Sequence, residues 1–138
     1  MIIDAKDSLL GRVCTVAAKE ILKGTKVDIV NCEEAVVSGT KESILARYHR
    51  KHKLGAPNKG PFFYRRPEMM VKRTIRGMLP WKISRGKDAF LNVKCHIGVP
   101  ENLKNQKHVV LEKALLSKIQ KTDYMRMKDI SKSVGGKL

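Results

Sequence analysis

The sequence predicts an α/β domain built on a mainly parallel sheet of about four short strands. An apolar stretch at Ile2 and Ile3, an amphipathic helix and a β-rich segment from Val27 to Asn31 follow one another at the start of the chain. Two strands joined through a helix form a right-handed crossover, which places them parallel in one sheet. A length of 138 residues fits one core, so residues 1–138 are predicted to fold as a single domain.

The helix after the first strand has a clear amphipathic pattern. Its apolar residues recur at the spacing of one helical face, and they are Leu10, Val13, Cys14, Ala17, Ala18, Ile21 and Leu22. Asp7 or Ser8 is expected to cap its N-terminus by accepting hydrogen bonds from free backbone N–H groups. Gly24 is expected to supply the left-handed residue that ends it. The pattern predicts a helix packed on a core.

A second helix is predicted to begin at Thr40, after a short apolar element at residues 35–37. The residues expected to face the core are Ile44, Leu45 and Tyr48. The residues expected on its outer face are Arg47, Arg50 and Lys51. The outer face of this helix is therefore basic.

A long loop is predicted from Lys53 to Arg66, because turn-forming residues are dense there, namely Gly55, Pro57, Asn58, Gly60 and Pro61. Long loops in compact domains are usually functional. A third helix is expected to begin at Pro67 and to stop before Pro80. Its apolar stripe consists of Val71, Ile75, Met78 and Leu79, and Arg73 and Arg76 lie together on an outward side.

The last third of the chain is predicted to add one buried strand and a final helix. The strand is expected from Val93 to Val99, after a short segment around Phe90 and Leu91. Apolar residues from Val109 to Ile119 indicate packed structure. Met127 to Val134, with Gly135 behind it, indicates a short helix.

Positive charge is concentrated in the middle of the chain. The sequence has 29 Lys and Arg against 13 Asp and Glu, a net charge of +16. Residues 47–94 hold 14 of the basic residues and 2 of the acidic ones, whereas residues 1–46 are close to neutral. Because an ordinary solvated surface mixes both signs, this segment favours a polyanion as its partner. Nucleic acid is the leading candidate.

The residues predicted to contact RNA are cations of this segment and two aromatic residues of the loop. They are Arg47, Arg50, Lys51, Lys53, Lys59, Phe63, Tyr64, Arg65, Arg66, Lys72, Arg73, Arg76, Lys82, Arg85 and Lys87. Arginine is prominent among them, and its planar guanidinium can bridge two phosphate oxygens.

The aromatic residues of the segment leave two interpretations open. Phe62, Phe63 and Tyr64 either stack on unpaired bases or hold the loop against the domain, and the sequence favours neither. For Trp81, which follows Pro80, packing is favoured over RNA contact.

The sequence contains no complete catalytic or metal-binding motif. Gly55 and Gly60 have the spacing of a phosphate-binding loop, but Pro61 follows where a Lys is required. The basic segment offers only Glu68 and Asp88 as carboxylates, too few to hold the metal ions of a nucleic-acid-processing enzyme. We therefore expect no enzymatic activity, no metal, no cofactor and no small-molecule substrate.

Histidines and cysteines also lack the spacing of a metal site. The candidate ligands are His49, His52, Cys95 and His96, and no Cys-x-x-Cys pair accompanies them. The apolar contexts of Cys14 and Cys32 indicate buried thiols, which fit a reducing compartment. No apolar run approaches the roughly 20 residues of a membrane span. A cytoplasmic protein without membrane association is expected.

Short motifs along nearly the whole chain form a recognisable series. They are Leu10-Gly11-Arg12, Ala17-Ala18-Lys19, Ile29-Val30-Asn31, Val37-Ser38-Gly39, Arg66-Pro67-Glu68, Arg76-Gly77-Met78-Leu79-Pro80 and Val99-Pro100-Glu101. Together they resemble the universal family of large ribosomal subunit protein 13. The continuations Trp81-Lys82 and Ile97-Gly98-Val99-Pro100 resemble its archaeal and eukaryotic branch, and the short length favours the archaeal type.

This resemblance implies a three-layer α/β/α domain with a basic loop and helical extensions. It implies a structural role in the large ribosomal subunit, binding to large-subunit ribosomal RNA, contacts with neighbouring ribosomal proteins and support of subunit assembly. It implies no catalytic residues. RNA contacts are expected on the basic loop and on the helix with Arg73 and Arg76, whereas the segment after Lys104 departs from the family pattern. An additional regulatory RNA-binding role outside the ribosome stays open.

Overall fold

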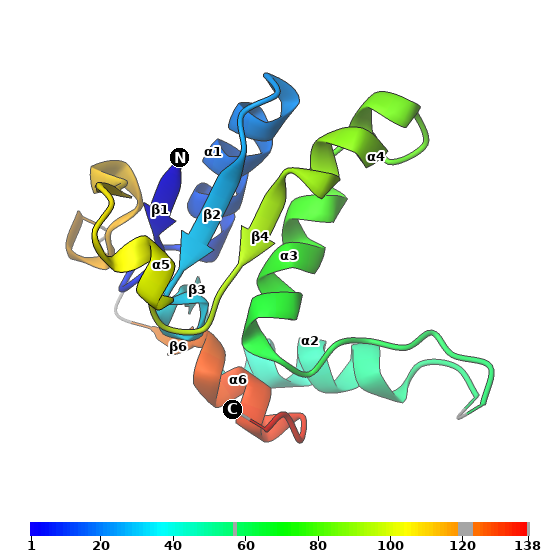
Figure 1. The fold of residues 1–138 in the computed structure, drawn as a ribbon. Helices are drawn as coiled ribbons and strands as arrows, with labels where there is room; N and C mark the ends of the chain where they lie inside the picture. The colour runs from blue at the N-terminus through cyan, green and yellow to red at the C-terminus, as the bar shows by residue number, and fades with distance from the viewer. Residues whose placement is uncertain (57, 119–122, 138) are drawn as a thin grey trace.

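The structure is a computed structural model that describes residues 1–56, 58–118 and 123–137 (Figure 1). A parallel sheet with the strand order β4-β2-β1-β5 lies at its centre, formed by β1 (Ile2–Asp4), β2 (Val27–Val30), β4 (Val93–Cys95) and β5 (His108–Val110). In the register of the sheet, Ile3 lies between Ile29 and Val109. Helices flank this sheet, so the predicted α/β class with a mainly parallel sheet of four strands is confirmed.

Two long helices bury much of the core. α1 (Leu10–Leu22) packs against α3 (Pro67–Gly77), α1 contacts β2, and α3 contacts β4. The face of α1 predicted from its apolar spacing is buried at Leu10, Val13, Cys14, Ala17, Ala18 and Ile21. Gly24 follows with a φ of 92°, the left-handed conformation predicted for the end of this helix. The crossover from β1 through α1 to β2 is therefore present.

The N-terminus of α1 differs from the prediction. Leu9 is the N-cap residue, and no described side chain caps the first turn. Ser8 is fully buried and donates its hydroxyl hydrogen to the carbonyl of Lys6, while Asp7 has a φ of 48° and accepts a hydrogen bond from Arg126. Both predicted caps are wrong, because the Asp7 side chain is bound by Arg126 of a distant segment and the Ser8 hydroxyl bonds the neighbouring carbonyl of Lys6.

The short apolar element at residues 35–37 contributes to a second sheet. β3 (Val36–Ser38) pairs antiparallel with β6 (Tyr124–Arg126), so that Val37 lies opposite Met125. A parallel neighbour in the main sheet requires a crossover of about a dozen residues or more. The connection from β2 to β3 is much shorter and contains the 3-10 turn Cys32–Glu34. The chain therefore leaves the main sheet after β2.

The remaining helices surround this framework. They are α2 (Lys41–Lys53), α4 (Ser84–Leu91), α5 (Glu101–Lys104) and α6 (Met127–Ser133), with further 3-10 turns at Glu112–Ala114 and Leu116–Lys118. In Figure 1, α2 and α6 lie side by side, in agreement with their contacts, and the connection from α2 to α3 extends away from the sheet. The predicted loop and final helix are confirmed, whereas Pro57 and Ile119 lie outside the described residues.

Two predicted elements have different boundaries or packing. The strand from Val93 ends at Cys95 instead of Val99. Val71, Ile75 and Leu79 are buried as predicted, but Met78, which directly follows the last residue of α3, is 41% exposed. No helix in the described part of the chain has the length and apolar character needed to cross a membrane.

α4 was not predicted as a helix. Only Gly86 and Ala89 are buried in it, so its sequence has little of the periodic apolar pattern of α1. Gly86 lies directly against the chain before it, since an added Cβ would come 2.2 Å from the carbonyl oxygen of Pro80. Glycine usually indicates a turn in a sequence, but here Gly86 lies inside a helix and is required by close packing against Pro80.

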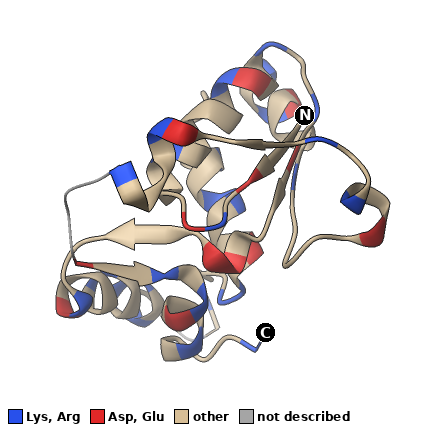
Figure 2. Ribbon diagram, turned by 90° about the vertical axis from the view of Figure 1, so that its left-hand side faces the viewer, with Lys and Arg blue, Asp and Glu red and all other residues tan. Residues whose placement is uncertain are grey.

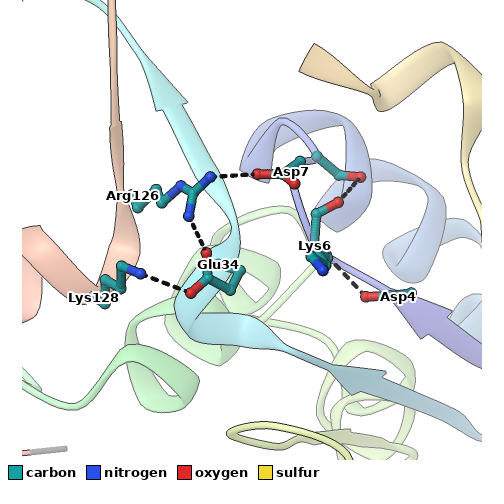
Figure 3. Close-up of polar contacts among 7 residues, drawn as sticks. Asp4, Lys6, Asp7, Glu34, Arg126 and Lys128 are labelled. Atoms are coloured by element: carbon teal, nitrogen blue, oxygen red, sulfur yellow. Dashed lines mark hydrogen bonds and ion pairs between the residues drawn. The ribbon is translucent and has the colours of Figure 1, made fainter. Parts of the chain in front are cut away.

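A charged cluster joins the C-terminal segment to the start of the chain (Figure 3). Arg126 donates to Asp7 at 2.9 Å and to Glu34 at 2.6 Å, and Lys128 donates to Glu34 at 2.9 Å. The hydrogen bond from Lys128 lowers the pKa of Glu34, and the nearby charges of Arg126, Lys128 and Lys6 lower it further against the opposing effect of burial. The ionised form of Glu34 is therefore the one that the fold stabilises.

Acid is expected to weaken this cluster. A carboxylate whose pKa is lower in the folded state stabilises the fold above its unfolded pKa, and that contribution is lost as the pH falls through the folded pKa. The expected window lies below the ordinary value of 4.5. Glu34→Gln should lower the free energy of unfolding at pH 7 and flatten its decline in this window, as measured by denaturant unfolding at a series of pH values. Glu20→Gln, which removes the ion pair with Lys23 at the C-terminal end of α1, is the control. A steeper decline for Glu34→Gln than for the parent protein would contradict the prediction.

Candidate nucleic-acid interface

The basic segment, residues 47–94, runs through α2, the following loop, α3 and α4. Among the described residues, one ion pair involves a cation of this segment, with Arg66 Nε 2.8 Å from Glu68 Oε1. The other Lys and Arg residues of the segment have no carboxylate partner in the described part of the chain. On the face shown in Figure 2, by contrast, Asp and Glu are interspersed with Lys and Arg. The described residues therefore leave the excess positive charge of the segment uncompensated.

A concave site lies where this segment meets the N-terminal half of the fold. Its volume is about 620 Å³, and α1, β3, α2, the loop and α3 all contribute to its walls. We call it the basic groove and define it by Arg47, Lys51, Arg73, Tyr48, Phe63 and Tyr64. None of the described residues that line it is Asp or Glu. The groove thus combines cations with aromatic rings.

The cations of the basic groove interact unfavourably with one another. Burial lowers the pKa of Lys51, and the positive charges of Arg47 and Arg73 lower it further. The Lys51 ammonium lies 5.4 Å from the centre of the Tyr48 ring, a cation–π arrangement. Like charges held together without a carboxylate disfavour the protonated form of lysine. An external anion in the groove would reverse this effect.

The aromatic residues of the loop are divided between two environments. Phe63 is half-buried and meets the edge of the His52 ring, with 6.1 Å between ring centres. Phe62 is 76% exposed and Tyr64 is 51% exposed. Burial lowers the pKa of His52, and the charges of Arg65 and His49 lower it further. Phe63 therefore packs against α2, and Tyr64 lines the groove with much of its surface free.

A second group of predicted residues lies between α3 and α4. The Arg76 guanidinium lies 4.1 Å from the centre of the Trp81 ring, and the Lys72 ammonium lies 5.1 Å from that of Phe90. Trp81 meets Phe90 edge-on at 5.2 Å, so the packing favoured for Trp81 is confirmed. Arg76 is consequently only partly exposed, and it does not line the groove with Arg73. The structure separates these two arginines.

The other predicted contacts are distributed over the outside of the segment. The exposed ones are Arg50, Lys53, Lys59, Arg65, Arg66, Lys82, Arg85 and Lys87. Arg85 donates a hydrogen bond to the carbonyl of Leu22 at 3.4 Å, and Arg66 is held by Glu68. The structure therefore brings Arg47, Lys51, Phe63, Tyr64 and Arg73 into one groove, and the other predicted residues do not line it.

The cysteines play no part in this surface. Cys14 and Cys32 are buried free thiols, as predicted, and Cys95 is partly buried. Burial raises the pKa of Cys14. In the described part of the chain, no three side chains of His, Cys, Asp or Glu gather in a way that would hold a metal ion.

Comparison with known proteins places the chain in a family. The family model for ribosomal protein L13 matches residues 1–102. The chain belongs to the ribosomal protein L13 family. It is 44% identical over 135 residues to the large ribosomal subunit protein uL13 of Archaeoglobus fulgidus, an alignment that covers 97% of this chain and 86% of the relative. It is 38% identical over 136 residues to uL13 of Methanococcoides burtonii, covering 99% and 98% of the two chains.

Membership of the L13 family confirms the resemblance found in the sequence, and these relatives are archaeal, as expected. Three of the motifs that carry the resemblance meet at the basic groove. Leu10-Gly11-Arg12, Val37-Ser38 and Gly77 lie far apart in the sequence but all line it. The L13 family model ends at residue 102, whereas the alignments with these two relatives cover 97% and 99% of this chain.

Some groove residues of this L13 family member were not predicted from its sequence. Arg12 lines the groove and also donates a hydrogen bond to the carbonyl of Lys113. Arg12 lies in the near-neutral first third of the chain, so the charge profile gives no signal for it. Tyr48 was assigned to the core, and its ring also forms part of the groove wall. The motif Leu10-Gly11-Arg12 is the sequence feature that includes Arg12.

Proposed function

We propose that this protein is a structural, non-catalytic constituent of the large ribosomal subunit that binds large-subunit ribosomal RNA and supports subunit assembly. Membership of the ribosomal protein L13 family and the relatives named large ribosomal subunit protein uL13 support the assignment to the particle. Its partners are the subunit's RNA and neighbouring ribosomal proteins, and its place of action is the cytoplasm.

The observation that carries RNA binding is the uncompensated charge of the basic segment. Its cations, apart from Arg66, lack a carboxylate partner among the described residues. A surface of one sign repels itself, and a polyanion that neutralises it also releases its own condensed counterions. We infer that the residues predicted from the sequence contact RNA, with Phe63 and Tyr64 as its aromatic contacts.

Co-sedimentation with purified large subunits tests this function. A constituent of the particle is expected to stay with the subunit in high salt, whereas a loosely bound regulator is released. Arg50→Ala combined with Lys87→Ala removes two exposed cations of the basic segment and should reduce retention. Lys19→Ala combined with Lys26→Ala removes the same charge from exposed sites outside it and should not.

Release of the parent protein at moderate salt would contradict the proposal and favour a regulatory RNA-binding protein outside the ribosome. Equal retention of both double variants at every salt concentration would show that the basic segment does not hold the protein on the subunit.

A further inference from the structure

We propose that the basic groove receives one unpaired nucleotide of the bound RNA, with its base against the aromatic wall and its phosphate near Arg47, Lys51 and Arg73. This inference rests on the proposed RNA-binding function and specifies how one part of the surface is used. The groove has the volume of a small-ligand site, since such sites measure about 300 to 1,000 Å³ and this one measures about 620 Å³.

The charges of the groove match a phosphate. Arg47, Lys51 and Arg73 come from two helices and converge closely enough that the two arginines disfavour the charge on Lys51. No Asp or Glu among the described lining residues offsets them. Of the three, Lys51 is partly buried, and withdrawing a cation from water is costly unless an anion accompanies it. None of the described lining residues supplies such an anion, and a phosphate from outside would.

The aromatic residues of the groove indicate that its ligand contains a base as well as a phosphate. A paired duplex presents its phosphates on a convex surface, and aromatic residues that line a groove add nothing to that contact. Unpaired bases, in contrast, stack on aromatic side chains and are the usual targets of RNA recognition. Tyr64 lines the groove with half of its surface exposed, and Tyr48 and Phe63 line it as well. The combination fits a base with its own phosphate.

Two glycines leave the groove open. Gly11 lies in the first turn of α1 and Gly77 is the last residue of α3, and both line the groove. A Cβ added at either position would meet no atom within 4 Å, and neither has a positive φ. Alanine is also the better helix former, so the fold gains nothing from glycine at these positions. Glycine at these two positions therefore serves the ligand, because it leaves room for a nucleotide in the groove.

Fluorescence measurements with two RNAs test the proposal. One RNA is a hairpin with a single unpaired 2-aminopurine, and the other is the same hairpin fully paired. The parent protein should bind the first roughly 10-fold more tightly, because stacking of one base on an aromatic ring has an effect of this order. Tyr64→Ala should abolish the preference. Lys87→Ala, outside the groove, should weaken both RNAs equally and leave the preference intact.

Substituting the two glycines distinguishes an effect on ligand binding from an effect on folding. Gly77→Ala and Gly11→Ala should leave the thermal unfolding temperature unchanged or raise it, and each should reduce the preference for the unpaired nucleotide. Equal binding of the two hairpins by the parent protein would overturn the groove assignment while leaving RNA binding intact. Failure to bind either hairpin would instead contradict the proposed function itself. A glycine variant that unfolds more easily would show that glycine serves the fold.

Discussion

Raising the salt concentration from about 50 to 200 mM is expected to weaken the binding of this protein to its RNA by roughly 10³- to 10⁵-fold. This range corresponds to about 6 to 10 phosphate contacts, by analogy with duplex DNA. The basic segment offers enough cations for that number, since 14 lie in it and one of them is held by a carboxylate among the described residues. Fluorescence anisotropy over a salt series measures the slope of log affinity against log salt.

Single-site variants make this measurement specific. Arg73→Ala should reduce the magnitude of the slope by about one contact. Lys19→Ala, on the exposed side of α1 outside the basic segment, should leave the slope unchanged. An affinity that hardly changes with salt would rule out phosphate contacts as the main source of binding.

Ile75→Asp is expected to unfold the domain. Ile75 is fully buried in α3, which packs on α1 and on β4. Removing its side chain leaves a cavity, and a carboxylate without a partner adds the penalty of burying a polar group, so the loss is on the order of 5 kcal/mol. This is comparable to the whole stability of many domains of this size. Thermal unfolding measures the loss, and RNA binding should fail together with the fold.

Arg73→Ala is the matched variant on the same helix. Arg73 is exposed and lines the groove, so its loss should change stability by less than about 0.5 kcal/mol and still weaken RNA binding. Arg76 is unsuitable for this comparison because its guanidinium packs on Trp81. If Arg73→Ala unfolded readily but bound RNA normally at low temperature, Arg73 would be a structural residue.

The sequence predicts an element correctly where its local apolar pattern agrees with the tertiary packing. The helical face of α1 repeats over 13 residues, and its buried side chains are those that the spacing selects. α4 buries only Gly86 and Ala89, so its pattern is too weak for the same inference. β3 was recognised as apolar, but its sheet depends on the length of the connection from β2 and on β6, which lies far along the chain. Distant pairing is not visible in local periodicity.

The candidate site, too, could be predicted from the sequence only in part. Counting charges locates the segment that contains Arg47, Lys51 and Arg73, but it cannot show that these three meet while Arg76 turns to Trp81. Arg12 joins the groove through the packing of α1 on α3, a contact that no charge window reports. Phe62 is 76% exposed whereas Phe63 packs on His52, a difference between neighbouring aromatic residues that the sequence does not reveal.

β1 is the first strand to be synthesised and among the last to be fully paired. Its neighbour β2 follows α1, but its other neighbour, β5, begins only at His108. Until β5 is made, one edge of β1 exposes backbone N–H and C=O groups beside Ile2 and Ile3, and such an edge is prone to pair with another chain. Pairing across so long a stretch of sequence also slows folding. A nascent or truncated chain that ends before residue 108 is therefore prone to aggregate, and the completion of β5 ends this vulnerable period.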